Sequence, residues 1–280
     1  MRNKAQTHLA ELARLPDAAI DLPRGALLIS GLLQPELDPD LHLRRLESLA
    51  IAAVSSVTRD APLTQRIAAL NRFIYDQEGF TGNLDDYYDP RNSFLDQVLE
   101  RRTGIPITLA LIYVELARQV GIPAFGVGFP GHFLVRVGQG GSTLVLDPFD
   151  HGTSLGEEDL DQRLADVYGE GALTVRANPA VLRAATRRET LVRMLANLKA
   201  IYSQAGDLEQ ALIAVNGILT LAPDSAADLR DRGMLYRELG YAPAAAADLR
   251  RYTQVSADGE EIAAIEPIIA ELEAGSLRLH

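Results

Sequence analysis

The sequence of 280 residues contains no cysteine, and this absence excludes several kinds of chemistry. Disulfides, thiolate metal sites and catalysis by a thiol nucleophile all require a cysteine sulfur. Basic residues are also scarce, with 27 Lys and Arg against 38 Asp and Glu, which gives a formal net charge of −11. Nucleic acids and anionic membranes both attract basic surfaces, so we expect this protein to bind neither.

Long hydrophobic runs are missing as well. A membrane-spanning helix needs about 18 or more consecutive apolar residues, and no such stretch occurs. Residues 1–4 are not followed by the apolar core of a signal peptide. We therefore expect a soluble, cytoplasmic protein. The chain is long enough for one large or two medium domains with ample core.

Helices are predicted for most of residues 1–80, separated by breaks at proline. Apolar residues recur there every three or four positions, as in Leu63, Ile67 and Leu70, which is typical of helices that face a core. A further helix is predicted to begin at Pro106, because proline is tolerated in a first helical turn. Gly121 follows the last position of its apolar pattern and should end this helix.

Short strands are predicted next, at 124–128, 132–137 and 143–147. The glycine-rich connection at 138–142 favours a hairpin between the last two. A turn on Gln139 and Gly140 would place His132 directly opposite Asp147, close enough for the carboxylate to orient the imidazole. A register shifted by one residue would separate the two side chains.

The segments 82–95, 101–108, 126–134 and 146–149 contain the longest motifs of the chain. Together these four segments resemble the SirB1 family, a branch of the transglutaminase-like superfamily. The resemblance covers nearly the whole chain. It implies an α+β fold, in which a transglutaminase-like (papain-like) helix and antiparallel sheet follow the N-terminal helices of 1–80.

The resemblance also implies where a catalytic triad would lie. Active members of the superfamily use a Cys, a His and an Asp, and the last two match His132 and Asp147. The Cys position falls on or beside Pro106, so the chain has no thiol nucleophile. We interpret His132 and Asp147 as retained triad positions that are not catalytic. A buried histidine and a strand-ending turn are the alternative interpretations of these two residues.

The polar segment 82–92 is predicted to bind a ligand, because Tyr and Arg often carry the binding energy of interfaces. The alternative is structural, with Asn83 and Asp89 as turn residues and the tyrosines as partly buried caps. Asp85 and its acidic neighbours lack the glycine and terminal glutamate of a calcium loop, so no metal site is predicted, and no cofactor. The candidate ligand-binding residues are Asn83, Asp86, Tyr87, Tyr88, Asp89, Arg91 and Asn92.

An internal repeat marks the C-terminal part of the chain. Its spacing of about 34 residues is that of a tetratricopeptide (TPR) helix pair. We predict a SirB1-type domain at 1–177 and an all-helical TPR-like domain at 178–280. Two repeats need cover from the front domain or another subunit, so a homo-oligomer is among the expected states. The matching positions are Leu195 and Leu229, Tyr202 and Tyr236, Gly206 and Gly240, and Ala211 and Ala245.

Two functions remain open. In the one we favour, the chain is a non-catalytic pseudoenzyme whose cleft recognises a ligand and whose TPR-like helices bind a protein partner or peptide. In the other, a hydrolase or acyltransferase uses the hydroxyl of Thr108 or Ser93, activated by His132. Thr108 should face about 200° away from the Cys position on the helix. A hydrogen bond from either hydroxyl to His132 would favour the enzyme.

Overall fold

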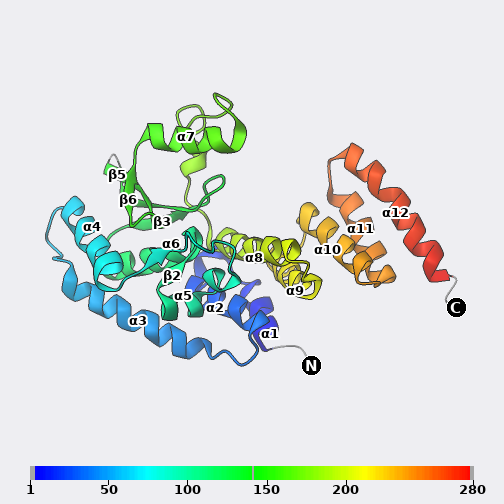
Figure 1. Cartoon of the computed structure of the whole chain (residues 1–280), viewed down its shortest axis with the longest axis horizontal. Coiled ribbons are helices and arrows are strands. Elements are labelled where there is room, and N and C mark those ends of the chain that lie inside the picture. Colours follow the sequence, from blue (N-terminus) through cyan, green and yellow to red (C-terminus); the bar gives the residue numbers. More distant parts are fainter. Residues whose placement is uncertain (1–3, 141, 278–280) are drawn as a thin grey trace. The chain divides into compact units, whose positions relative to one another are not determined.

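The computed structural model describes residues 4–140 and 142–277. The chain forms two compact units, one of Pro16–Met194 and one that joins Met1–Leu15 to Leu195–His280. Figure 1 labels most of the helices and strands and colours them along the sequence. Helices and an antiparallel sheet make up the first unit, and the second is helical in its described part. The predicted α+β fold followed by a helical region is therefore confirmed. The predicted domain boundary at 177–178 stays a prediction.

Two of the N-terminal helices of the first unit begin where an aspartate provides a cap. The Asp21 carboxylate accepts a hydrogen bond from the backbone N–H of Arg24, and Asp38 caps the next helix in the same way through Asp40. Ile67 and Leu70 of the predicted stripe are buried, as their spacing predicts, and Leu63 is partly buried. The elements are a 3-10 turn η1 (Asp17–Ala19), α2 (Leu22–Leu33), α3 (Pro39–Ser56), α4 (Leu63–Asn71) and a π-helical turn η2 (Arg72–Gln77).

Helix α6 (Pro106–Gln119) lies at the centre of this unit. It contacts α3, α5 (Leu95–Arg101), β3 (Ala124–Val127) and β4 (Leu134–Gln139). It begins at Pro106 and ends just before Gly121, whose φ of 70° is readily adopted only by glycine. Both predicted ends are thus confirmed. Two short parallel strands pair just ahead of this helix, one at the start of the 82–92 segment and one at residues 103–104. The neighbouring elements are β1 (Thr81–Gly82), η3 (Pro90–Ser93), α5 (Leu95–Arg101) and β2 (Thr103–Gly104).

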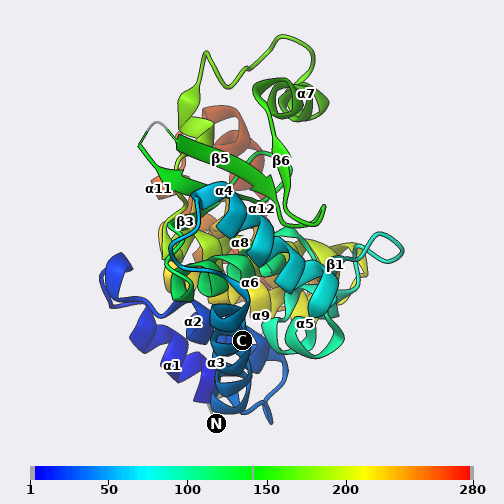
Figure 2. The ribbon, with the colours of Figure 1, turned by 90° about the vertical axis from the view of Figure 1, so that its left-hand side faces the viewer.

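The sheet has four antiparallel strands in the order β3-β4-β5-β6, with β3 and β6 at opposite sides (Figure 2). The predicted hairpin register is wrong, because Gln139 pairs with Ser142 and so belongs to the strand rather than to the turn. His132 lies ahead of β4, so the predicted strand start at 132 is wrong too. The fourth strand was not predicted. The strands are β3 (Ala124–Val127), β4 (Leu134–Gln139), β5 (Ser142–Asp147) and β6 (Thr153–Leu155).

A small core joins the sheet to α7 (Glu157–Tyr168). Leu160 and Leu164 of this helix are buried against Phe129 and Leu134. The 3-10 turn η4 (Pro179–Leu182) adds partly buried apolar side chains to the same cluster. This packing holds α7 beside the end of β5, where Asp147 lies.

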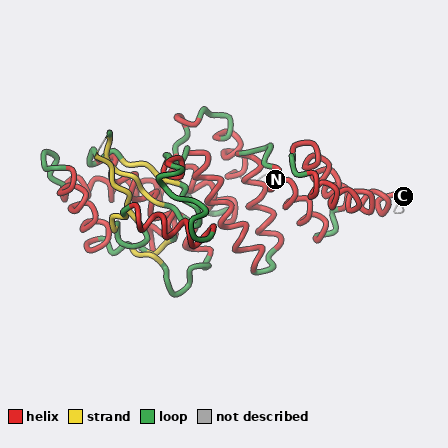
Figure 3. The backbone as a smooth tube through the Cα atoms, turned by 90° about the horizontal axis from the view of Figure 1, so that it is seen from above, coloured by secondary structure: helices red, strands yellow, loops and turns green. Residues whose placement is uncertain are grey.

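The second, helical unit has equivalent turns at the matched glycines of the 34-residue repeat. Gly206 and Gly240 have φ values of 73° and 80°, and each follows a helix of the repeat. Helix α1 (Lys4–Leu12) packs on α9, and α12 packs on α11. The described residues of the second unit contain no strand. Figure 3 shows the helices of the chain in red and its strands in yellow. The helices of the repeat region are α8 (Arg187–Gln204), α9 (Leu208–Leu221), α10 (Ala226–Glu238), α11 (Ala242–Val255) and α12 (Gly259–Leu277).

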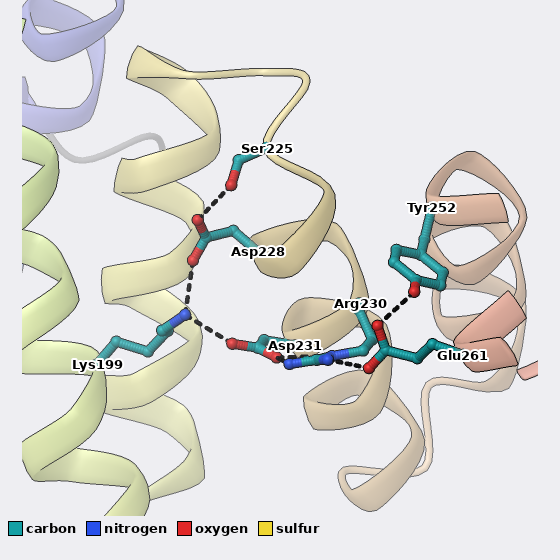
Figure 4. Close-up of polar contacts among 7 residues, drawn as sticks. All are labelled: Lys199, Ser225, Asp228, Arg230, Asp231, Tyr252 and Glu261. Atoms are coloured by element: carbon teal, nitrogen blue, oxygen red, sulfur yellow. Dashed lines mark hydrogen bonds and ion pairs between the residues drawn. The ribbon is translucent and has the colours of Figure 1, made fainter. Parts of the chain in front are cut away.

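A chain of polar contacts links four of these helices (Figure 4). The Lys199 ammonium of α8 lies 2.6 Å from carboxylate oxygens of both Asp228 and Asp231 on α10. Arg230 pairs with Asp231 and with Glu261 of α12, which also accepts a hydrogen bond from a tyrosine hydroxyl of α11. Burial lowers the pKa of Lys199, but the two carboxylates raise it by more, so the ammonium stays charged.

Candidate functional site

His132 and Asp147 meet in the first unit, although the predicted register is wrong. His132 follows Gly131, whose φ of 69° turns the chain just ahead of β4. Asp147 is the last residue of β5. The His132 Nε2 atom lies 2.9 Å from Asp147 Oδ1. The turn before the strand, rather than a cross-strand pair, therefore brings the two side chains together.

Asp147 is a buried carboxylate, 1% exposed, with three polar partners. Its Oδ1 atom also accepts a hydrogen bond from the backbone N–H of Phe149 at 2.9 Å, and Oδ2 accepts one from Arg163 Nη2 at 2.7 Å. Burial raises the pKa of Asp147, but the bonds from His132 and Phe149 and the charge of Arg163 outweigh it and leave the pKa below its ordinary value. Asp147 is thus ionised at neutral pH.

The sequence analysis did not identify Arg163 as a partner of Asp147. The position of Arg163 beside two apolar residues of a helix was the one signal that the sequence offered. It lies on α7 between the core residues Leu160 and Leu164, where a long charged side chain can reach over the sheet. Helical spacing alone does not tell which strand end such an arginine meets. Its partner follows only from the packing of α7 beside β5.

The ionised Asp147 fixes the tautomer of His132. A carboxylate can only accept, so Nε2 carries the proton and Nδ1 of a neutral ring is an acceptor. No described residue hydrogen-bonds to Nδ1. The ring of Phe149 lies edge-on to His132 with 6.3 Å between centroids, and Tyr87 lies 5.9 Å from Phe149 in the same manner. An aromatic row thus runs from the imidazole to the 82–92 segment.

Neither candidate hydroxyl nucleophile reaches His132. Thr108 is fully buried, and its Oγ1 atom lies 2.9 Å from the carbonyl oxygen of Asn92 and 3.0 Å from that of Ile105. The same oxygen accepts a hydrogen bond from the backbone N–H of Ile105 and so caps α6. Ser93 is also fully buried, and its hydroxyl has no hydrogen-bond partner among the described residues. The contact between nucleophile and base that covalent catalysis requires is missing from this geometry.

Several of the predicted ligand-binding residues shape their own loop. Asn92 is fully buried, donates to the carbonyl oxygen of Asp86 at 2.8 Å and accepts from the amide of Asn83 at 3.1 Å. Asp89 is buried in ion pairs with Arg91 at 2.8 Å and Arg101 at 3.4 Å. Burial raises the pKa of the Asp89 carboxyl, but the bonds and charge of Arg91 lower it by more. Asn83, Asp89 and Asn92 therefore hold the loop in shape.

The exposed part of this loop combines apolar and aromatic side chains with the charged Asp85, Asp86 and Arg91. Leu84 is 82% exposed, Tyr88 is 62% exposed and Tyr87 is 39% exposed. The two tyrosine rings pack edge to face with 5.3 Å between centroids. Leu84 was not among the predicted residues. Such an exposed group is typical of a contact surface for another molecule.

His151 lies in a polar group with Tyr75 and Thr81. Its φ of 47° is unusual for a residue other than glycine. The His151 ring stands 5.4 Å from that of Tyr75, and its Nε2 atom lies 3.4 Å from the Thr81 hydroxyl. The Tyr75 hydroxyl is buried without a described partner, and burial with nearby negative charge raises its pKa well above the ordinary value. Nothing in the sequence indicated that Tyr75 would lie beside His151 with a buried hydroxyl.

A separate cavity of 810 Å³ lies between α6, β3 and the starts of α2 and α8. Its lining includes Phe133 but neither His132 nor Asp147. The cavity is a distinct feature of the same unit.

Comparison with known proteins assigns both parts of the chain. Residues 41–196 match the family described as transglutaminase-like superfamily. The chain belongs to the transglutaminase-like superfamily. Residues 198–270 of this superfamily member match a tetratricopeptide repeat. The repeat predicted from the 34-residue spacing is therefore confirmed.

The relatives of this transglutaminase-like protein include bacterial and animal proteins. A UPF0162 protein of Xylella fastidiosa is 38% identical over 269 residues, which cover 96% of each chain. A UPF0162 protein of Pseudomonas aeruginosa is 35% identical and covers 89% of each chain. F-box only protein 21 of Homo sapiens is 35% identical over 214 residues. These residues make up 71% of this chain and 32% of the human protein. A solved structure of menin matches at 10% identity with a TM-score of 0.40, too low to support an argument.

The helices of the described residues are all too short or too polar to cross a membrane.

Proposed function

We propose that this chain is a non-catalytic transglutaminase-like protein that acts as a binding or regulatory scaffold module. Its single strongest support is the lack of a usable nucleophile beside His132. The chain has no cysteine, and Pro106 stands where the resemblance places the thiol. Pro106 is buried and offers neither a thiol nor a hydroxyl.

The hydroxyl of Thr108 is an unsuitable substitute. To attack a substrate, Thr108 would have to give up its contacts with the Asn92 and Ile105 backbones in a fully buried position. An unpaired buried backbone group costs about 1–3 kcal/mol. A hydroxyl nucleophile also needs an adjacent base, and His132 is bonded to neither Thr108 nor Ser93. The enzyme alternative thus lacks a supporting observation.

The recognition surface that we propose is the exposed loop beside the His132 site. Leu84, Tyr87 and Tyr88 would make the apolar contacts, with Asp86 and Arg91 at the polar rim. The aromatic row through Phe149 connects this loop to the His132 imidazole, whose Nδ1 acceptor faces no described donor. A ligand that offers one hydrogen-bond donor and an apolar group fits this combination.

The TPR-like helices would bind a protein partner or peptide, as such repeats generally do. We also propose that the chain belongs to the SirB1 branch of the superfamily, that it divides near residues 177–178 and that it is cytoplasmic. A homo-oligomer is part of the same proposal. The name of the human relative refers to an F-box, and its match covers only 32% of that protein.

Assays of the purified protein against amide, ester and amine-acceptor substrates test this proposal. We expect no turnover above that of a His132→Ala variant, because no nucleophile is activated by that imidazole. The variants Thr108→Ala and Ser93→Ala serve as matched controls for the two hydroxyls. Turnover that survives purification and is lost both in His132→Ala and in one hydroxyl variant would establish the hydrolase or acyltransferase instead.

A further inference from the structure

The imidazole of His132 keeps one ring nitrogen for a ligand. Its Nε2–H is bound to Asp147, and the side chain of His132 is 14% exposed. Nδ1 is an acceptor that meets no donor among the described residues, so a group that binds there has to bring a donor of its own. An ionised carboxylate or phosphate has no proton to donate. Such an anion therefore does not satisfy this nitrogen.

The aromatic row that starts at this imidazole becomes more exposed along its length. Phe149 lies between His132 and Tyr87, and Tyr87 packs edge to face with Tyr88. A Cβ atom on Gly82 would lie 2.6 Å from the Phe149 ring, so only a glycine admits the ring in this place. Tyr87 is 39% exposed and Tyr88 is 62% exposed. The faces of aromatic rings carry partial negative charge and attract cations.

Three carboxylates accompany the rings of this row in the sequence. Asp85 and Asp86 directly precede the two tyrosines, and Asp150 follows Phe149. All three carboxylates are exposed, and none forms an ion pair with a described residue. Their negative charge remains available to a cation that approaches the rings.

The positive charges of the same region are fewer. Arg91 and Arg101 share the buried carboxylate of Asp89, which leaves one of their two charges uncompensated. Arg193 of α8 forms no ion pair with a described residue, and its charge lowers the pKa of the Tyr87 hydroxyl, which burial raises. Three carboxylates and the net charge of −11 for the whole chain stand against these two positive charges. The balance favours a cation.

We propose that the aromatic row binds a cationic side chain, that of a lysine or an arginine, from a partner protein. The charged N–H group would donate to Nδ1 of His132, and the methylene chain would lie along Phe149 and Tyr87. Hydrogen bonds from a charged donor are about twice as strong as those from a neutral donor, which selects the cation over a hydroxyl or an amide. This inference rests on the recognition surface proposed above and names the chemical class of its ligand.

The cation n-butylammonium reproduces the lysine side chain and is the probe. It is titrated into the full chain at neutral pH, and NMR follows the ring signals of His132, Tyr87 and Tyr88. We expect a Kd at least about threefold below that of 1-butanol, which has the same carbon chain without the charge. Butyrate, an anion with the same number of carbon atoms, should give no saturable shift.

Variants of the protein test the part that charge plays. Replacing both Asp85→Asn and Asp86→Asn should raise the Kd of n-butylammonium about twofold or more and leave that of 1-butanol unchanged. The Arg193→Gln variant should lower the Kd of n-butylammonium, because a repelling charge is removed. The matched control replaces two exposed carboxylates elsewhere in the chain, Glu36→Gln with Asp60→Asn, and should bind as the wild type does.

Four outcomes would overturn the choice of a cation. They are equal Kd values for n-butylammonium and 1-butanol, saturable binding of butyrate, an unchanged Kd in the doubly substituted Asp85 and Asp86 variant, and weaker n-butylammonium binding in Arg193→Gln. In each of them a ligand still binds at the loop, so the recognition surface itself stands. If none of the three probes shifts the ring signals, the recognition surface is refuted together with this inference. The lack of catalysis is tested by turnover and is independent of these titrations.

Discussion

Asp147 connects three separate parts of the first unit through one buried side chain. It accepts hydrogen bonds from His132 ahead of β4, from the backbone of Phe149 and from Arg163 on α7. A buried carboxylate is tolerated only when such partners compensate its desolvation. His132 and Arg163 therefore have a structural role as partners of the buried Asp147 carboxylate.

Arg163→Ala is expected to lower the free energy of unfolding by about 1–3 kcal/mol at neutral pH, because it leaves the buried Asp147 charge with fewer partners. The pKa of Asp147 is lower in the folded than in the unfolded chain. Its contribution to stability is thus present above the unfolded value of about 3.9 and is lost as the pH falls through the folded value. Urea unfolding at pH 7 and pH 3 measures both effects.

The control for this variant is Arg118→Ala. Arg118 forms an ion pair with Glu115, but its side chain is 63% exposed, so the loss should stay below about 1 kcal/mol. Equal losses in the two variants, or a loss in Arg163→Ala that does not shrink in acid, would contradict the role given to Asp147.

Thr108 offers a second test at the scale of one side chain. Thr108→Val keeps the shape but removes the hydroxyl that caps α6, and should cost about 1–2 kcal/mol of stability. Thr108→Ser keeps the hydroxyl and should lose clearly less. Thermal unfolding of both variants compares them. A stable Thr108→Val protein would mean that the hydroxyl is not needed for the fold and would reopen a catalytic role.

At the scale of elements, the sequence predicts helices better than strand registers. Helix α6 has a proline at its first position and a glycine just beyond its end, and both signals are local. The β4–β5 turn lies in a segment with three glycines, Gly138, Gly140 and Gly141, so several turns are sterically acceptable. Tertiary packing selects among these turns, and the position of α7 over β5 cannot be seen in local spacing.

The start of α8 depends on a capping box that local sequence does contain. Thr186 Oγ1 accepts from the backbone N–H of Glu189, whose carboxylate accepts from the N–H of Thr186 at 2.8 Å. Arg183 lies 2.7 Å from the same carboxylate. The hydrogen bonds from Arg183 lower the pKa of Glu189 most, and those from Thr186 lower it further. Burial raises this pKa by less, so the result is about 2.

Glu189→Gln should therefore reduce stability above pH 5 by less than about 1 kcal/mol, since the side chain is 46% exposed and screened by water. The sign follows from the lowered pKa: the contribution is present above the unfolded value of about 4.3 and fades as the pH falls toward 2. Unfolding at pH 7 and pH 3.5 should show the smaller difference at pH 3.5. A difference that grows in acid would contradict the capping role.

At the scale of the whole molecule, the chain ends complete the repeat region. Two TPR-like helix pairs would leave apolar faces exposed at the two ends of the array. The sequence therefore predicts that a segment outside the repeats covers these faces. Helix α12 packs on α11, and α1, from the other end of the chain, packs on α9. The repeat could be predicted because its spacing is local. The partner helix α1 could not, because nearly 200 residues separate it from α9.

Leu9→Ala tests the contribution of α1. Leu9 is 1% exposed, and its truncation should cost about 2–4 kcal/mol because a cavity remains in the packed face. Ile51→Ala is the control, since Ile51 is 66% exposed and its loss should stay within about 0.5 kcal/mol. Hydrogen exchange should show faster opening of α9 in Leu9→Ala. Unchanged protection there would contradict the packing of α1 on α9.

Intact-mass spectrometry after incubation with an activated ester tests the non-catalytic account most directly. A hydroxyl nucleophile in a working site forms an acyl-enzyme, which adds one acyl group per chain. We predict no stoichiometric adduct that depends on His132, because the Thr108 hydroxyl is occupied by backbone contacts and Ser93 does not reach the imidazole. A single adduct on Thr108 or Ser93 that is absent in His132→Ala would contradict the account.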